Sequence, residues 1–566
     1  MSRAAVARNA PSVQKLVRML HDAVAAQRAG QVETAAKLYT AVLRERPDEF
    51  NALHMLGLID YQRGRLPEAA RLITAALRSE PNSADAWSNL GLVLHAQDEY
   101  AKALDAFDRA LALKPDRAEV LNNRGTTLNC LKRHEDALDS FTRAVALRPD
   151  YLFARFNQGS TLLGLGRFAE ALASFEATLA IAPNHADTLC HRGNVLLKLN
   201  RVEDAFASYA QALAITPDHP QILQNYTVAL RHLGRPREAL ESSEKAIRIK
   251  PDYAAARFEQ AIALLALGDF ERGWAAYESR WQLAEFEPQR RNYGRPLWLG
   301  QEDIAGKTVL LHCEQGYGDT LQFARYAPLL AERGATVVLE VQEHLKALLS
   351  QMPGVSQIVA RGEPLPPFDL YCPLLSLPLA FGTRRETIPA NVPYIAADPG
   401  RTAHWAAKLS DFAGKTKIGL VWAGNSSANA IDTRRSLRLS EFAPLAVLSG
   451  VQFFSLQKGE PAAQAQHPPE DFALTDYSSE LHGFEDTAAL IANLDLVISV
   501  DTSVAHLAGA MGKPVFILSR FDGCWRWLNH RDDSPWYRTA RLFHQKAPGA
   551  WDEVIACVCE ALRQAA

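Results

Sequence analysis

Cysteine is scarce in this chain of 566 residues. Its seven cysteines are too few for a disulfide framework, and no two of them form a Cys-x-x-Cys pair. The spacing of cysteine and histidine offers no zinc site either. We therefore expect reduced thiols, as in a cytoplasmic protein, and no bound metal.

Long apolar runs are also missing. No stretch of about 20 uncharged apolar residues occurs, so we expect no transmembrane helix. Residues 1–12 carry two arginines but no apolar segment behind them, which argues against a secretory signal peptide. These two absences indicate a cytoplasmic protein that does not insert into a membrane.

No excess of charge of either sign is present. The chain has 61 Lys+Arg against 64 Asp+Glu, a formal net charge of -3, which argues against a dedicated nucleic-acid binder. The GxGxxG fingerprint of dinucleotide sites is absent, and no DxD motif stands at an expected strand end of the second half. The pair Asp532-Asp533 lies in a loop-like stretch and is interpreted as a turn. We therefore predict no cofactor.

The first half has an internal repeat of 34 residues. Alanines keep this step from Ala69 to Ala239, and prolines keep it from Pro81 to Pro251. The small residue that defines the register is glycine, at Gly57, Gly91, Gly125, Gly159 and Gly193. Small residues let two helices approach closely, and the proline separates one unit from the next because it cannot continue a helix. Residues 16–285 resemble about eight tetratricopeptide repeats (TPRs) with atypical terminal units, after a tail at 1–15.

A polar position recurs two residues before each repeat glycine or its equivalent. It is occupied by Asn89, Asn123, Asn157, His191 and Asn225. In TPRs this position faces the groove, and an amide both donates and accepts hydrogen bonds, so the series can hold a peptide backbone. A similar asparagine ladder occurs in O-linked N-acetylglucosamine transferase. The alternative is that these side chains bond locally or to water. Either way, TPRs indicate a protein or peptide partner.

After a polar linker at 286–299, apolar strand-like runs alternate with helical stretches. The runs are 308–313, 336–341, 357–360, 369–372, 417–422, 451–456, 496–500 and 514–518. This alternation predicts parallel α/β sheets in two Rossmann-like halves, 300–400 and 401–566, the first of them short. Ligands of such sheets bind beyond the carboxyl ends of the strands.

Two strand ends carry polar motifs. The segment 314–320 contains Gly316 and Gly318, which permit a tight turn and close approach to a ligand, and Asp319, which is either a helix N-cap or a base. The segment 501–510 predicts a helix beginning near Thr502 or Ser503, and its N-terminus suits a phosphate. The alternative is an ordinary capped helix with His506 packed inside.

Three further segments are open to two interpretations. Asn425 follows one further strand and precedes Arg435, and Lys458 follows another. Arg435 and Lys458 could place cations at the edge of the cleft, or their charges could simply be solvated. The aromatic segment 524–528 could stack on a base or a sugar, or pack between the halves. Local sequence does not decide among these possibilities.

The second half, about residues 295–566, resembles family 9 glycosyltransferases, the family of the ADP-heptose:lipopolysaccharide heptosyltransferases. The segment 501–508 is similar to the family's donor-phosphate motif, and 318–321 resembles the segment that carries its proposed base. The resemblance implies an α-solenoid followed by an α/β GT-B fold. The TPR array is foreign to the lipopolysaccharide enzymes, and the chain looks most like bacterial fusions of TPRs to a family 9-like domain.

What this resemblance implies is an inverting, metal-independent glycosyltransferase with a nucleotide-sugar donor and a protein acceptor, at a serine or threonine hydroxyl. Asp319 would be the base. The donor would be held by Gly316, Gly318, Asn425, Arg435, Lys458, Asp501, Thr502, Ser503 and His506. Two alternatives are a TPR scaffold with an inactive glycosyltransferase-like domain, and a glycolipid or lipopolysaccharide transferase. The sequence does not identify the nucleotide, sugar, acceptor or oligomeric state.

Overall fold

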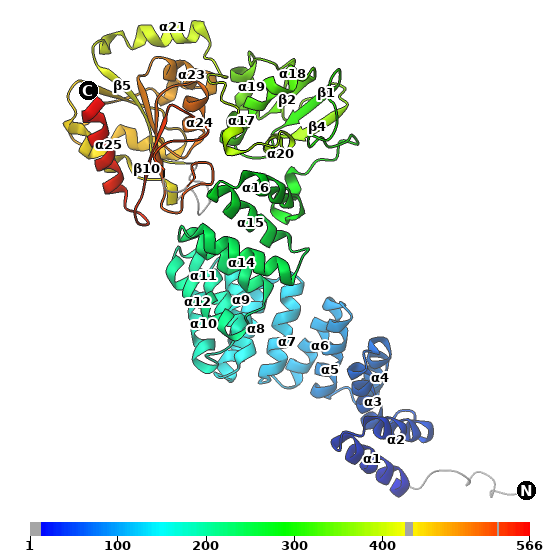
Figure 1. The fold of residues 1–566 in the computed structure, drawn as a ribbon. Helices are drawn as coiled ribbons and strands as arrows, with labels where there is room; N and C mark the ends of the chain where they lie inside the picture. The colour runs from blue at the N-terminus through cyan, green and yellow to red at the C-terminus, as the bar shows by residue number, and fades with distance from the viewer. Residues whose placement is uncertain (1–12, 425–433, 529–530, 566) are drawn as a thin grey trace, which may run out of the picture. The chain divides into compact units, whose positions relative to one another are not determined.

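The computed structural model describes residues 13–424, 434–528 and 531–565. The chain divides into two compact units, Met1–Arg201 and Val202–Ala566. Helices make up the chain as far as α16, and strands appear only after it (Figure 1). The division into units falls inside the helical array. The boundary near residues 285–300 that the sequence suggests between repeats and α/β part stays a prediction.

The first unit is a TPR solenoid of antiparallel helix pairs. Its helices are α1 (Val13–Arg28), α2 (Val32–Glu45), α3 (Phe50–Gln62), α4 (Leu66–Ser79), α5 (Ala84–Ala96), α6 (Tyr100–Leu113), α7 (Ala118–Cys130), α8 (His134–Leu147), α9 (Leu152–Gly164), α10 (Phe168–Ile181) and α11 (Ala186–Lys198). Among the helices of the described residues, none combines the length and apolarity that crossing a membrane requires.

Three of the repeat glycines, Gly91, Gly125 and Gly159, lie against a phenylalanine ring on the second helix of the pair. A Cβ on Gly91 would lie 2.6 Å from Cε1 of Phe107, and one on Gly125 would lie 2.7 Å from Cε1 of Phe141. Real Cβ atoms do not approach a ring so closely, so glycine is what lets the two helices of a pair come together. The aromatic ring, fully buried in both cases, fills the space between them.

The second unit begins with more helices of the same kind. These are α12 (Val202–Ile215), α13 (Pro220–His232), α14 (Pro236–Ile249), α15 (Ala254–Leu267) and the shorter α16 (Phe270–Tyr277). Two 3₁₀ turns, η1 (Glu278–Gln282) and η2 (Ala284–Gln289), follow α16. Beyond these turns, the first strand begins at Thr308.

The first sheet of the α/β part is parallel, in the order β3-β2-β1-β4. Its strands and the helices between and after them are β1 (Thr308–His312), α17 (Tyr317–Phe323), α18 (Ala327–Glu332), β2 (Thr336–Val341), α19 (Glu343–Leu349), β3 (Gln357–Ala360), β4 (Leu370–Pro373) and α20 (Leu377–Ala380). β1, β2 and β4 are largely buried, as parallel strands covered on both faces are, and the edge strand β3 is buried at its last two residues.

The second sheet is also parallel, in the order β10-β9-β8-β5-β6-β7. Its elements are α21 (Pro399–Lys408), β5 (Thr416–Val421), β6 (Val451–Ser455), β7 (Leu474–Asp476), α23 (Phe484–Ala492), β8 (Leu496–Val500), α24 (Ser503–Ala510), β9 (Val515–Ser519), β10 (Ala540–His544) and α25 (Trp551–Ala565). Two such sheets with covering helices agree with the expected α/β glycosyltransferase fold.

The last helix pair shares its core with the sheets. Trp274 of α16 is 2% exposed, and its ring packs against Phe323, Trp525 and Trp536 at centroid distances of 6.1, 5.2 and 6.4 Å. One continuous cluster of buried side chains runs from α15 and α16 through both sheets. The end of the solenoid is therefore part of the α/β core.

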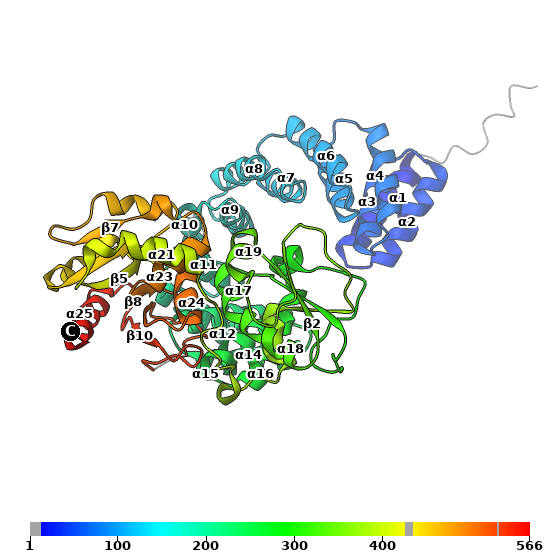
Figure 2. The same ribbon diagram turned by 90° about the horizontal axis from the view of Figure 1, so that it is seen from above.

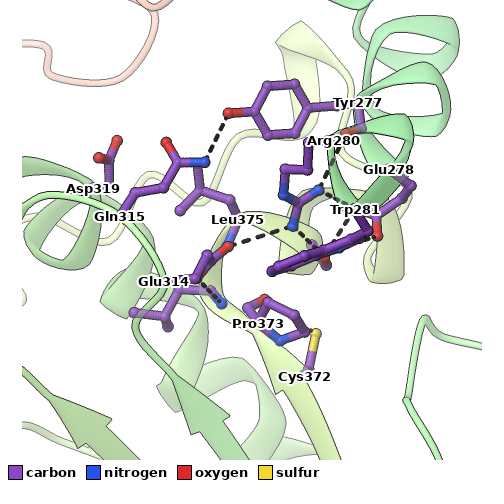
Figure 3. A network of polar contacts seen from close by, with 12 residues as sticks. Tyr277, Glu278, Arg280, Trp281, Glu314, Gln315, Asp319, Cys372, Pro373 and Leu375 are labelled. Atoms are coloured by element: carbon purple, nitrogen blue, oxygen red, sulfur yellow. Dashed lines mark hydrogen bonds and ion pairs between the residues drawn. The ribbon is translucent and has the colours of Figure 1, made fainter. Parts of the chain in front are cut away.

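A buried polar network fastens the same junction (Figure 3). Arg280 of η1 is fully buried and contacts Glu278 at 2.6 Å, Glu314 at 3.4 Å and the Ser376 hydroxyl at 2.7 Å. Glu314, directly after β1, accepts the backbone N–H groups that follow β4 at residues 374 and 375, both at 3.1 Å. The network joins the last turn of the solenoid to the ends of two neighbouring strands.

The segment 286–299 is ordered along the first sheet. Leu297 forms a parallel bridge with Tyr371 of β4, and the N–H of Trp298 donates to the Tyr371 carbonyl at 2.9 Å. Arg291 contacts both carboxylate oxygens of the buried Glu340 at 2.7 Å. Because β4 is an edge strand, this segment covers backbone groups that would otherwise be open to another chain.

Candidate functional site

Helices α17 and α24 follow strands of different sheets, β1 and β8. They lie side by side in both ribbon views (Figures 1 and 2). Gly318 lies at their contact: a Cβ there would be 2.8 Å from Cδ2 of His506 and 3.6 Å from Cα of Ser503. The sequence suggests that Gly318 approaches a ligand. In the structure, the residues that lie close to Gly318 are His506 and Ser503.

Asp319 is not the N-cap of its helix. Helix α17 starts at Tyr317 with Gly316 as N-cap, so Asp319 is the third helical residue, and the N-cap interpretation is wrong. Its Oδ2 accepts the Gly316 N–H at 3.0 Å, which is one half of a capping box, since glycine has no side chain to supply the other half. Its Oδ1 forms an ion pair with Arg526. Asp319 is 17% exposed at the side chain, so it lies near the surface of the site without being freely solvated.

Two basic residues of the β9–β10 connection are missing from the sequence-based set of site residues. Arg526 pairs with Asp319, and Arg520 follows β9 and contacts Asp522 at 2.6 Å. Arg520 stands directly after β9, and ligands of parallel sheets bind beyond the carboxyl ends of the strands. Its position in the sequence therefore marks it as a candidate. Arg526 lies in the segment 524–528, where the two neighbouring tryptophans are the more conspicuous residues.

Asp501 lies among cations at the carboxyl end of β8. Arg435 donates to its backbone carbonyl at 2.7 Å. Burial raises the pKa of the Asp501 carboxyl, but His506, and after it the charges of Arg526, Arg520 and Arg435, hold it below its usual range. The carboxylate is therefore ionised at neutral pH and sits in a positive surrounding.

Helix α24 begins at Ser503 with Thr502 as N-cap, as the sequence predicts to within one residue. The Thr502 side chain makes no capping bond to the helix and instead pairs with the Ser499 hydroxyl at 3.0 Å. No side chain caps the first N–H groups of this helix, which carry the positive end of its dipole. Such an end suits an anion.

His506 is buried, at 4% exposure, inside the contact of α17 and α24. Its Nδ1 lies 3.0 Å from the Tyr537 hydroxyl, and its ring stacks on Trp527 at a centroid distance of 5.2 Å. Burial lowers its pKa to about 3, so the ring is neutral at neutral pH. His506 can offer one N–H but no charge.

The remaining donor-side residues have different surroundings. Gly316 has open space on its Cβ side except for Asp319, 3.4 Å away. Arg435 is half-buried beside Asp501. Lys458 is exposed, and its ammonium donates to the carbonyls of Ser478 and Leu481 at 2.7 and 2.8 Å, so it fastens a loop. Asn425 lies outside the described residues.

The tryptophans of 524–528 pack inside the protein. Trp527 is fully buried against His506, and Trp525 packs on Trp274 and Phe323. Asp533 pairs with Arg531 and forms an isolated bridge with Arg541. Within the described ranges, no three His, Cys, Asp or Glu side chains gather in a way that could hold a metal ion.

Each residue of the polar series lies half-buried on the first helix of its pair. In the first unit, Asn89 bonds to His54 at 2.9 Å, and Asn157 donates to Asn122 at 2.9 Å. Asn122 in turn donates to Asn123 at 3.3 Å, and His191 packs edge-on to Phe156. Asn225 lies in the second unit, on α13. These contacts link neighbouring repeats, and the binding of a peptide stays a prediction.

Tetratricopeptide repeat profiles match residues 23–72, 54–118, 156–220 and 228–288, and a second such profile matches 116–184. The profile of glycosyltransferase family 9 (heptosyltransferase) matches residues 479–518. That short match contains α23, β8 and α24, and so includes the residues from Asp501 to His506.

Among curated proteins, the chain is similar to Protein FlbA of Caulobacter vibrioides, with 29% identity over 330 residues, 54% of either chain. The alignment thus spans about half the length of that relative. Among solved structures, the TPR protein YrrB, described as having an unusual peptide-binding site, has 28% identity, covers 33% of this chain and 97% of its own, and has a TM-score of 0.31. PilF of Pseudomonas aeruginosa has 26% identity, covers 37% and 96%, and has a TM-score of 0.34. The chain therefore combines tetratricopeptide repeats in its N-terminal part with a segment in its C-terminal part that matches the glycosyltransferase family 9 (heptosyltransferase) profile.

Proposed function

We propose that the protein transfers a sugar from a nucleotide-sugar donor to a serine or threonine hydroxyl of a protein recruited by its repeats, with inversion and without a metal. The observation that carries this proposal is the N-terminus of α24. It lies within the family 9 match, has no side-chain cap, and stands beside Asp501 and several arginines.

The charges at this position suit the leaving group of such a transfer. Breaking the bond between the anomeric carbon and phosphate leaves a negative nucleotide. Arg435, Arg520 and Arg526 lie close enough to Asp501 to lower its pKa, so their charge is also available to an anion placed at α24. Fixed donors and cations aimed at a developing negative charge are usually a large part of catalysis. Guanidinium groups can fill this role where other transferases use a metal ion.

Asp319 is the base in this proposal. Its carboxylate takes the proton of the acceptor hydroxyl, and the oxygen forms its new bond to the anomeric carbon from the face opposite the nucleotide. The old carbon–oxygen bond breaks as the new one forms, and its electron pair leaves with the phosphate. One displacement of this kind inverts the anomeric configuration. Asp501 binds sugar hydroxyls.

A panel of nucleotide sugars tests the proposal on the full chain, with thermal unfolding and nucleotide release as readouts, with and without EDTA. A ligand present at 100 times its Kd stabilises a protein by about 2.7 kcal/mol. We expect one nucleotide family to stabilise the protein equally in EDTA. Asp319→Asn should keep this stabilisation and lose transfer. The matched control is Asp398→Asn, since Asp398 caps α21 in the same unit, accepting the Arg401 N–H at 2.8 Å. An absence of any response, or its loss in EDTA, would count against the proposal.

A second candidate is a protein-binding scaffold whose glycosyltransferase-like domain is inactive. One observation favours it: both carboxylate oxygens of Asp319 already have partners, the Gly316 N–H and Arg526. A scaffold predicts that Asp319→Asn and wild type bind partner proteins alike, and that neither releases nucleotide from any donor.

A further inference from the structure

Arg526 links the two halves of the α/β part at the proposed base. It comes from the connection between β9 and β10, 207 residues after Asp319 in sequence, and forms an ion pair with Asp319 Oδ1. Its Nε donates to Gln322 Oε1 at 2.9 Å, one helical turn further along α17. The Arg526 side chain is 13% exposed. The guanidinium group therefore binds α17 at two residues, Asp319 and Gln322.

The support of Arg526 is rigid. Its guanidinium lies 4.2 Å from the ring centroid of Trp525, and Trp525 is wedged between Trp274 and Phe323. An exposed ion pair on flexible side chains contributes little, because ordering the side chains opposes it. Here packing has already ordered the arginine, so its position relative to Asp319 is well defined.

Two donors fix the carboxylate of Asp319. The backbone N–H of Gly316 holds Oδ2 and the guanidinium holds Oδ1. Each carboxylate oxygen has two lone pairs, so one on each remains to accept a proton. Arg526 also lies close enough to Asp501 to help lower the pKa of that carboxyl.

We propose that Arg526 is a positioning residue for Asp319: its guanidinium keeps this carboxylate turned toward the acceptor hydroxyl. This role rests on the proposed function. It makes a specific demand, because the two-pronged geometry of Arg526, and not its charge alone, governs kcat. A residue that only held the fold together would not distinguish arginine from lysine in a folded protein that still binds the donor.

The test is kcat for nucleotide release with an acceptor, set beside thermal stabilisation by the donor, both measured on the full chain. For Arg526→Lys we expect kcat to fall roughly tenfold with the loss of the fork, while the charge and the stabilisation by the donor remain. For Arg526→Gln, which loses both the fork and the charge, kcat should fall further. Thermal unfolding confirms that each variant is folded, and if Arg526→Gln is not, the lysine variant decides alone.

The control is Arg531→Gln in the same connection, since Arg531 also binds a carboxylate, that of Asp533, in two contacts of 2.6 Å. It should leave kcat unchanged. An active wild type with an unchanged kcat in Arg526→Lys, or a fall in kcat that accompanies an equal loss of stabilisation by the donor, overturns the role of Arg526 alone. A wild type that releases no nucleotide at any pH overturns the proposed function and this role with it.

Discussion

His232, the last residue of α13, places its Nδ1 2.6 Å from Nη1 of Arg434. Arg434 also contacts Asp522 at 2.8 Å, and Asp522 contacts Arg520 at 2.6 Å. Burial together with the charges of Arg231, Arg434 and Arg520 lowers the pKa of His232 far below its usual range, so the ring is neutral and its Nδ1 accepts a hydrogen bond from Arg434. A solenoid helix therefore helps to hold the arginines next to the proposed donor site.

Removing this acceptor should weaken both fold and donor binding. His232→Ala leaves a buried guanidinium N–H unsatisfied, which costs about 1–3 kcal/mol. We expect a lower unfolding free energy and a higher donor KM. His232→Asn is the matched control, because an Asn amide oxygen can take the place of Nδ1, and it should recover most of both losses. Equal behaviour of the alanine and asparagine variants would show that the contact contributes nothing.

The shared core predicts where the chain can be cut. A fragment starting at Val202 keeps a complete compact unit and should unfold cooperatively. A fragment starting at Gly300 loses Trp274 and Arg280, which exposes the apolar surface around Trp525 and leaves the buried Glu314 without its cation. We expect this shorter fragment to be insoluble or to bind hydrophobic dyes. Circular dichroism and thermal unfolding of both fragments check the prediction, and a cooperative transition in the shorter one would contradict it.

Most of the α/β fold can be predicted from the sequence because central parallel strands are continuous apolar runs. Every strand expected from such a run is present. The two that the sequence does not reveal, β7 and β10, are the edges of the second sheet. β7 is only three residues long, and β10 alternates buried and exposed positions near its start, so neither forms an apolar run. Edge strands have one paired side only and need less apolar sequence.

The sequence predicts the residues of the candidate site only where they lie near the ends of predicted strands. Asp501 stands directly after β8, and Asp319 stands seven residues after β1, in the glycine-containing segment 314–320, so both lie near strand ends. The partner of Asp319 is not predictable, because Arg526 is 207 residues away and reaches it only through the packing of two sheets. The same holds for His232 and Arg434, which are 202 residues apart. In the sequence, His506 looks like a hydrogen-bond donor to a ligand. Its burial depends on tertiary packing and cannot be predicted from the local residues.

Glu314 should make stability depend on pH. Burial raises its pKa to about 7 from an ordinary value of 4.5, although Arg280 opposes the rise. Between these values the folded protein keeps a proton that the unfolded chain releases. The stabilisation is therefore fully present below about pH 4.5 and is lost as pH rises through 7. We expect the unfolding free energy of wild type minus that of Glu314→Gln to fall by roughly 1–3 kcal/mol from pH 5 to pH 8.

Urea unfolding at several pH values measures this difference. The control is Glu363→Gln, since Glu363 is an exposed carboxylate paired with Lys346. The pKa of Glu363 is lowered, chiefly by that pairing, so its contribution has the opposite sign, and exposure keeps it small. A difference between wild type and Glu314→Gln that stays constant over this range would mean that Glu314 is ionised throughout in the folded protein.

Gly318→Ala should separate α17 from α24. The added methyl would lie 2.8 Å from Cδ2 of His506, and His506 cannot move away because its ring is stacked on Trp527 and bonded to Tyr537. Overpacking of this kind typically costs about 1–3 kcal/mol. Gly164→Ala, at the end of α9 with nothing within 4 Å, is the matched control and should be neutral or slightly stabilising. If both variants unfold at the wild-type temperature, α17 and α24 are not packed as the structure shows. If Gly318→Ala is destabilised and also loses donor-induced stabilisation, the contact that orders α17 also orders the start of α24, where the donor's phosphate is proposed to bind.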